Sequence, residues 1–261
     1  MPEFGIVGGS GLYNIPGLEI TDEVQVSTPY GAPSDSYKAG KLAGNEIVFL
    51  PRHGTEHNIQ PHRINYRANI WGFRQLGVKR LLSVFAAGGI SSNMKPGTIV
   101  VPDQIIDHTG GRASTFYDEA EVVHIDFTDP FCPDLREYIV KATEQAGITI
   151  VKKGTYIAVN GPRLETAAEI RAYTVLGADI VGMTAMPEAS LAREAEICYA
   201  GLSVVTNYAA GISGQKLTVT EVKDMMTASE DSLRLVLKDF FGLDFGPPTC
   251  SCRKTLDQAR M

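Results

Sequence analysis

The sequence is poor in cysteine, in basic residues and in long apolar runs, and each shortage excludes a class of protein. The 261 residues include only four cysteines, Cys132, Cys198, Cys250 and Cys252, which are too few and too scattered for a disulfide framework. The pair in Cys250-Ser251-Cys252 lacks a second Cys or His pair nearby in the sequence. We therefore expect free or redox-active thiols there, peripheral to any chemistry, rather than a metal site.

Basic residues are outnumbered, since 24 Lys and Arg stand against 30 Asp and Glu and give a net charge of −6. A nucleic-acid surface needs clustered Lys and Arg to displace counterions, so we expect no nucleic-acid partner. The chain has no apolar run of about 18 residues and no basic flank before an apolar region at its N-terminus. We therefore expect neither a membrane span nor a signal peptide, and a cytoplasmic location.

The chain also lacks a linker, a low-complexity tract and an internal repeat, which favours a single domain over residues 1–245 and a C-terminal tail over 246–261. Apolar, often β-branched segments alternate with segments of helical pattern. This alternation is typical of an α/β domain with a mostly parallel, mixed central sheet flanked by helices. The expected strands are 4–7, 46–50, 80–85, 98–101, 154–159, 180–183 and 202–206, and the expected helices are 65–76, 134–146, 166–176, 188–196 and 220–240.

A glycine-rich turn, Gly8-Gly9-Ser10-Gly11, directly follows the first expected strand. Glycines let the backbone turn tightly, and successive N–H groups with the Ser10 hydroxyl can form a concavity for an anion such as phosphate. The motif lacks the Lys of a P-loop and the spacing of a dinucleotide fingerprint. Alone, it fits a plain tight turn better than a phosphate site.

Other potential anion donors follow other expected strands, at the edge of the sheet where ligands gather in α/β proteins. Singly, each has an ordinary structural explanation: a lone His is most often a satisfied structural residue, and a lone Arg a surface cation. Together with Ser10 they predict one shared phosphate site. These residues are Arg52, His53, Ala86, Ala87 and Thr184. In that order they offer a guanidinium fork, a ring N–H, two backbone N–H groups and a hydroxyl.

Two further strand ends carry groups suited to a heterocyclic base. Glu165 precedes a capping-box pattern formed by Thr166 and Glu169, so it is either a favourable carboxylate at a helix N-terminus or an acceptor for a ligand N–H. Asn207 closes the strand 202–206 and is either a turn residue or a group that donates and accepts at once. The second role suits a base edge that bears a carbonyl and a nitrogen.

With these residues in place, the chain resembles the purine nucleoside phosphorylases of the methylthioadenosine phosphorylase family over roughly residues 4–245. The resemblance implies a trimer-forming α/β phosphorylase with a nucleoside phosphorylase-like fold, inorganic phosphate as co-substrate and no metal or organic cofactor. The resemblance leaves open whether the trimers stay single or pair into hexamers. The motifs that carry the resemblance are residues 5–12, 28–34, 52–54, 65–71, 161–163, 182–188 and 206–208.

The resemblance also implies a role for each matching residue. Asn207 would stabilise the departing base, Met183 would lie under the sugar, and His124 would reach into the sugar site of a neighbouring subunit unless it is a lone surface His. The positions implied to bind phosphate are Ser10, Arg52, His53, Ala86, Ala87 and Thr184, and those implied to bind the nucleoside are Met183, Glu165, Asn207, Tyr208, Ala209, Val219 and His124.

Departures from the adenine-specific pattern predict the substrate. Asn207 and Ala209 stand where relatives that accept 6-aminopurines carry Asp, and an Asn amide can donate to a carbonyl O6. Glu165 would accept the N1–H of a 6-oxopurine. Val219 matches the position of a His that binds the 5′-hydroxyl in inosine and guanosine phosphorylases, and an apolar side chain suits a methylthio group.

We therefore expect phosphorolysis of S-methyl-5′-thioinosine to hypoxanthine and 5-methylthioribose 1-phosphate. An inosine/guanosine phosphorylase and a methylthioadenosine phosphorylase are the alternatives among enzymes. A non-catalytic nucleoside-binding or scaffold protein is the alternative from another class, and it has no need of a phosphate site.

Overall fold

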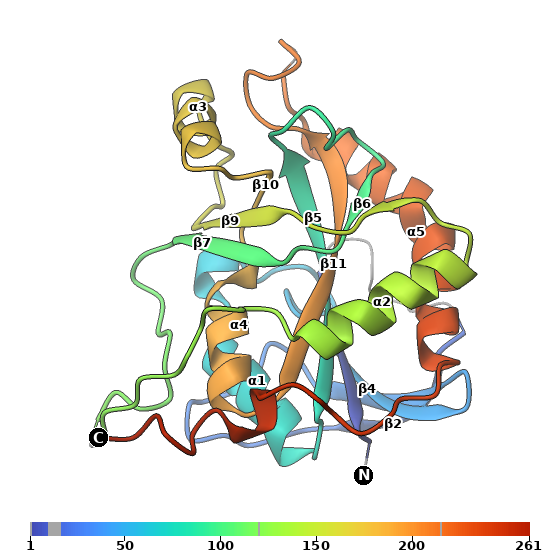
Figure 1. Ribbon diagram of the computed structural model, residues 1–261, viewed down its shortest axis with the longest axis vertical. Helices are drawn as coiled ribbons and strands as arrows, with labels where there is room; N and C mark the ends of the chain where they lie inside the picture. The colour runs from blue at the N-terminus through green and yellow to red at the C-terminus, as the bar shows by residue number, and fades with distance from the viewer. Residues whose placement is uncertain (1, 10–16, 120, 215) are drawn as a thin grey trace.

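A computed structural model describes residues 2–9, 17–119, 121–214 and 216–261 (Figure 1). Strands and helices alternate along most of this part of the chain. The strands are β1 (Phe4–Gly8), β2 (Glu19–Val24), β3 (Tyr37–Leu42), β4 (Asn45–Pro51), β5 (Arg80–Gly89), β6 (Ile99–Val100), β7 (Gln104–His108), β8 (Ile150–Val151), β9 (Thr155–Val159), β10 (Ile180–Gly182) and β11 (Cys198–Tyr208). The helices are α1 (Tyr66–Gln75), α2 (Pro133–Gln145), α3 (Ala167–Val175), α4 (Ala185–Glu194) and α5 (Val219–Phe241), with 3₁₀ turns η1 (Pro61–Arg63) and η2 (Cys252–Lys254).

One mixed sheet joins all of these strands in the order β2-β3-β4-β1-β5-β10-β9-β7, and β5 also pairs with β11, which continues through β6 to β8. The central strands β4, β1, β5 and β11 run parallel. Their sequences are nearly continuous apolar runs because both faces of a parallel sheet are covered. The predicted mixed, mostly parallel α/β sheet is therefore confirmed.

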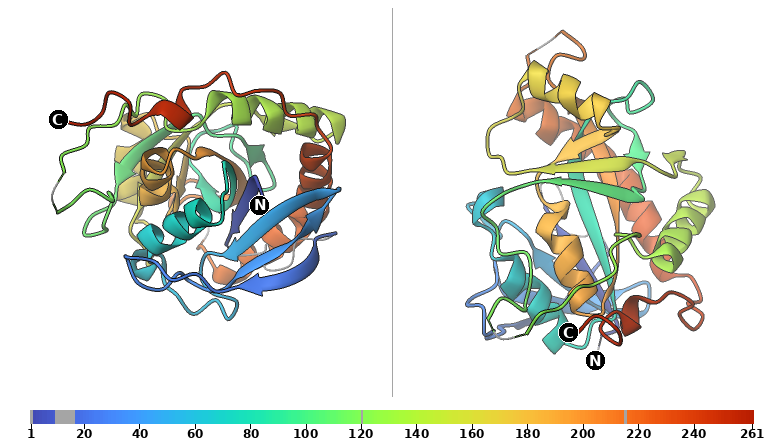
Figure 2. Two further views of the ribbon diagram at one scale, coloured as in Figure 1. Left: turned by 90° about the horizontal axis from the view of Figure 1, so that it is seen from below. Right: turned by 60° about the vertical axis from the view of Figure 1, so that its left-hand side comes forward.

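Helices cover both faces of the sheet (Figure 2). On one face α1 and α4 pack together, and on the other α2 packs against α5. Each pair has its own apolar core: Ile70 and Phe73 of α1 belong to one, and Leu135 of α2 with Leu233 of α5 to the other. The five expected helices are all present within a few residues of their predicted bounds.

The structure corrects the prediction for β5, which was expected to end at Phe85 but continues to Gly89. It continues because β11 pairs with it as far as Tyr208, opposite Gly89. Ala86 and Ala87 consequently lie inside a strand and not in a loop after one.

Residues 246–261, expected as a tail, pack against the rest of the molecule. Cys252 is fully buried, and the carboxylate of Asp134 accepts hydrogen bonds from the backbone N–H groups of Thr249 and Cys250. The backbone N–H of His124 donates to the carbonyl of Ala259. The C-terminal segment is thus part of the folded body. No helix in the described ranges has the length and apolar character needed to cross a membrane.

Candidate functional site

A gap in strand pairing lies beside the cavity that collects the predicted site residues. β1 ends at Gly8 opposite Val84, and β10 pairs with β5 only at Gly88 and Gly89. Between these two points no described strand pairs with residues 85–87 on this side, so backbone groups of β5 stay available to a ligand. A cavity of about 350 Å³ opens here, within the usual size of a small-molecule site.

Most of the predicted site residues converge on this cavity, although they come from six segments of the chain. Its lining includes His53, Ala86, Ala87, Glu165, Met183, Thr184, Asn207 and Val219. Arg52, Tyr208, Ala209 and His124 are not part of the lining, and Ser10 lies outside the described residues.

Arg52 lies beneath the cavity in a buried ion pair. Arg52 and Glu188 are both about 1% exposed, and Nε of Arg52 donates to Glu188 Oε2 over 2.8 Å. Nη2 donates to Glu188 Oε1 and to the hydroxyl of Ser83. Glu188 also accepts from the hydroxyls of Ser83 and Tyr199.

Nε and Nη2 of Arg52 are engaged by Glu188, so the full guanidinium fork is not available to phosphate, and the predicted phosphate contact of Arg52 stays a prediction. Nη1 donates to the carbonyl of Val84 and lies 3.0 Å from where a Cβ on Gly9, the first residue after β1, would stand. Any contact between Arg52 and phosphate would be made through Nη1. The small size of Gly9 keeps that approach open.

His53 also differs from its predicted role as a ring N–H donor. Its Nδ1 lies 2.8 Å from the carbonyl oxygen of Ile59, and a carbonyl oxygen accepts only, so Nδ1 carries the hydrogen. Burial, reinforced by the charge of Arg52, lowers the pKa of His53 to about 4. The ring is neutral near pH 7, and Nε2 is an acceptor suited to a phosphate oxygen that carries a proton.

The low pKa of His53 makes stability depend on pH. The unfolded chain takes up a proton at His53 near its ordinary pKa of 6.5, whereas the folded protein does so only near 4, so stability is lost as the pH falls from 6.5 towards 4. When the pH is lowered from about 8 to about 5.5, the free energy of unfolding of wild type should fall by roughly 1 kcal/mol more than that of His53→Gln. Denaturant unfolding of both proteins measures the difference. Equal losses in the two proteins would mean that His53 titrates normally when folded.

Asn207 presents a polarised amide to the cavity. Its Nδ2 donates to the carbonyl of Tyr208 and its Oδ1 accepts from the hydroxyl of Thr206, both over 2.8 Å. An amide has two N–H groups and two lone pairs, so one donor and one acceptor position remain for a ligand.

Tyr208 and Ala209 do not share this orientation. Tyr208 faces a neighbouring hollow that Leu217 also lines. The backbone N–H of Ala209 donates to Gly89 and its side chain is about 1% exposed, within an apolar cluster that includes Ile90. A contact between the Ala209 side chain and the substrate therefore has no support from the cavity lining and stays a prediction.

Glu165 lies at the cavity beside the start of α3. The capping box is formed by Thr166 and Glu169, so the helix N-terminus does not use Glu165 as its cap. Burial raises the pKa of Glu165. A partly desolvated carboxyl that faces a cavity favours the ligand-acceptor role.

Sequence reasoning missed Arg112, which donates hydrogen bonds to two segments of the site, one at the end of β9 and one at the start of α4. Its Nη1 donates to the carbonyls of Met183 and Met186, and its Nη2 to those of Val159 and Asn160. The arginine follows a Gly-Gly pair in an irregular segment, which gives no local signal for such a role. Arg112 fixes the position of Met183 without lining the cavity.

The chain is similar to known phosphorylases over nearly its whole length. A curated relative from Thermodesulfovibrio yellowstonii, named "Probable S-methyl-5'-thioinosine phosphorylase", is 50% identical over 98% of this chain and 97% of its own. The "6-oxopurine nucleoside phosphorylase" of Pyrococcus furiosus is 50% identical over 91% of each chain. A crystal structure of a methylthioadenosine phosphorylase from an antarctic soil metagenomic library superposes with a TM-score of 0.92 at 37% identity, covering 100% of this chain and 92% of that one.

The family model of the phosphorylase superfamily matches residues 3–242, which include every described residue that lines the cavity. Since this match, the relatives at 50% identity and the shared fold all extend over nearly the whole chain, the chain belongs to the phosphorylase superfamily.

Proposed function

We propose that the chain catalyses phosphorolysis of a 6-oxopurine nucleoside, with S-methyl-5′-thioinosine as its substrate and hypoxanthine and 5-methylthioribose 1-phosphate as products. The observation that carries the proposal is that Asn207 and Glu165 both line the same cavity. The names of the two relatives at 50% identity support it.

The reaction needs no nucleophile from the protein. Phosphate, bound against Ala86, Ala87, Thr184 and His53, attacks C1′ of the ribosyl group as the glycosidic bond lengthens, and its negative charge stabilises the oxocarbenium character that develops. Phosphate is both nucleophile and electrostatic partner, so we further propose that no metal or organic cofactor takes part.

The protein's main task is to stabilise the departing base. The free N–H of the Asn207 amide donates to the O6 and N7 edge of hypoxanthine, where negative charge accumulates. Glu165, when ionised, accepts the N1–H that hypoxanthine has and adenine lacks. Adenine would set its unprotonated N1 against the Glu165 carboxylate, and its 6-amino group would take the acceptor side of the Asn207 amide at the cost of the N7 contact. Each loss costs roughly 1–3 kcal/mol.

The test is a comparison of kcat/KM for methylthioinosine, methylthioadenosine, inosine and guanosine, with and without phosphate. We expect base release to require phosphate and methylthioinosine to have the highest value. Base release in the absence of phosphate would contradict the reaction, and a higher value for methylthioadenosine would contradict the substrate.

The apolar end of the cavity is proposed to bind the 5′-methylthio group. Val219 is the first residue of α5, is 68% exposed and lines the cavity with Leu164 and Val222. We expect Val219→His to lower the ratio of kcat/KM for methylthioinosine over inosine by about fivefold, as apolar contact worth ~1 kcal/mol is exchanged for a hydrogen bond to a 5′-hydroxyl. Val219→Leu should keep the wild-type ratio, and an unchanged ratio in Val219→His would place the 5′ group elsewhere.

We further propose that the enzyme works in the cytoplasm as a homotrimer or a dimer of trimers. The side chain of His124 is exposed and does not line the cavity of its own chain, so a role at the sugar requires a second copy. Activity per chain should fall on dilution over the range in which sedimentation shows dissociation, and His124→Ala should lower kcat/KM without changing the sedimentation coefficient. A fully active monomer would contradict the proposal.

A further inference from the structure

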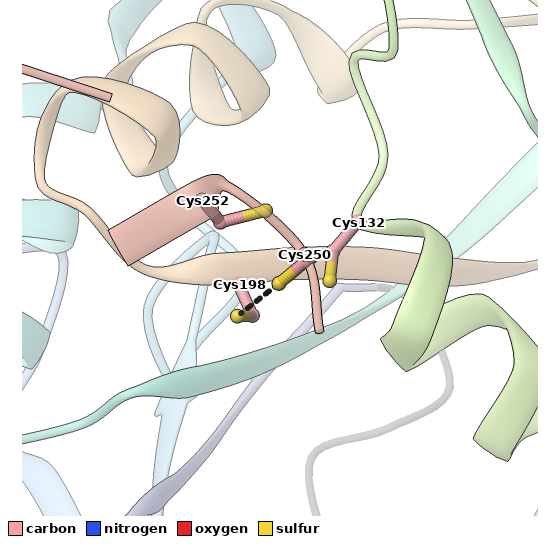
Figure 3. A group of neighbouring side chains, drawn as sticks. All are labelled: Cys132, Cys198, Cys250 and Cys252. Atoms are coloured by element: carbon pink, nitrogen blue, oxygen red, sulfur yellow. Dashed lines mark hydrogen bonds between the residues drawn. The ribbon is translucent and has the colours of Figure 1, made fainter. Parts of the chain in front are cut away.

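The structure gathers all four cysteines of the chain in one place, although they are far apart in the sequence (Figure 3). Cys132 precedes α2, Cys198 begins β11, and Cys250 and Cys252 lie in and beside η2. Their four Sγ atoms all lie within 4.8 Å of one another, and those of Cys198 and Cys250 are 3.5 Å apart. The pair Cys250 and Cys252, which lacks a second Cys pair nearby in the sequence, therefore has one beside it in space.

We propose that Cys132, Cys198, Cys250 and Cys252 form a tetrathiolate site that binds one Zn²⁺ ion and ties the C-terminal segment to the domain. Tetrahedral Zn–S bonds of about 2.3 Å place the sulfurs roughly 3.8 Å from one another. In this cluster each sulfur is close to all three others. Two disulfides would require only two close pairs, whereas a tetrahedral ion requires this mutual proximity.

The N-terminus of α2 favours a thiolate at one of the four cysteines. Sγ of Cys132 is the N-cap of this 13-residue helix and accepts from the backbone N–H of Leu135 over 3.4 Å, a position that stabilises negative charge.

Charged side chains lie beside the sulfurs. Arg80 and Asp134 line the same small hollow as Cys132 and Cys198. Arg80 and Arg253 share the carboxylate of Glu3, so two guanidinium groups and two carboxylates surround the cluster.

The site is remote from the proposed chemistry. Cys198 begins β11 and Asn207 lies near its other end, a separation of roughly 30 Å along an extended strand. The ion would therefore be structural: by holding η2 against α2 and β11, it would keep residues 246–261 packed. The proposal that no metal takes part in phosphorolysis is unaffected.

The test is metal analysis of the full-length protein, purified without chelators under anaerobic conditions and dialysed. We expect one zinc ion per chain in wild type and in the matched control Ser251→Ala, and almost none in Cys252→Ser. Replacement of zinc by Co²⁺ in wild type should give the sulfur-to-cobalt charge-transfer bands and the strong visible bands of a tetrahedral thiolate site. Removal of the metal from wild type should lower the melting temperature.

The Co²⁺ spectrum needs no variant, so the proposal stays testable if Cys252→Ser fails to fold. Wild type with no zinc and no thiolate bands with Co²⁺ would overturn it. Two disulfides would also overturn the proposal. They would lower the intact mass by four hydrogens relative to the fully reduced chain, and none of the four cysteines of the unfolded protein would react with a thiol reagent.

Discussion

Arg52→Met is expected to lower the free energy of unfolding by roughly 3–5 kcal/mol, the usual cost of removing one partner from a buried ion pair. The substitution keeps much of the side-chain volume but leaves Glu188, which is about 1% exposed, without its cation. The hydroxyls of Ser83 and Tyr199 still donate to Glu188 but supply no charge. Denaturant unfolding of both proteins at neutral pH measures the loss.

A second substitution separates the ion pair from simple packing. In Arg52→Met combined with Glu188→Gln no buried charge remains, and Oε1 of the amide can still accept from Ser83 and Tyr199. We expect this double variant to regain at least half of the lost stability. A double variant less stable than Arg52→Met would show that Glu188 stabilises the fold independently of Arg52.

The central strands could be located from the sequence because burial on both faces leaves a distinctive apolar run, as in β1, β4 and β11. The edge strand β2 could not: its sequence Glu-Ile-Thr-Asp-Glu-Val is almost wholly exposed, and its pairing with β3 is made by backbone groups. The four residues that extend β5 are Ala and Gly, which have low strand propensity. Their conformation is imposed by the partner strand β11.

The site residues that lie at the ends of strands could be predicted from the sequence. Contacts between residues far apart in the sequence could not. His53, Thr184 and Asn207 converge because the sheet brings its strand ends together. Arg52 and Glu188 are 136 residues apart in the sequence, so no local pattern shows that the guanidinium is already paired. The cysteine cluster was missed for the same reason.

Asn207→Asp is expected to shift the ratio of kcat/KM for methylthioinosine over methylthioadenosine towards the 6-amino substrate by 10- to 100-fold, which corresponds to about 1.4–2.7 kcal/mol. In wild type Nδ2 of Asn207 lies 2.8 Å from the carbonyl oxygen of Tyr208. A carboxylate oxygen there would repel that carbonyl, so the Asp side chain should rotate towards the cavity while still accepting from Thr206. A carboxylate facing the base accepts from a 6-amino group and repels O6.

The matched controls distinguish polarity from mere loss of contact. Asn207→Ala removes both donor and acceptor and should lower kcat/KM for both substrates without inverting their order. Glu165→Gln should act in the same direction as Asn207→Asp, because an amide can donate to the unprotonated N1 of adenine. A second Asp at position 209 is not a suitable addition, since Ala209 is about 1% exposed and a carboxylate there would be buried without a partner. If Asn207→Asp keeps the wild-type ratio while Glu165→Gln changes it, the pyrimidine edge alone selects the base, and the Asn207 amide serves only to hold the end of β11.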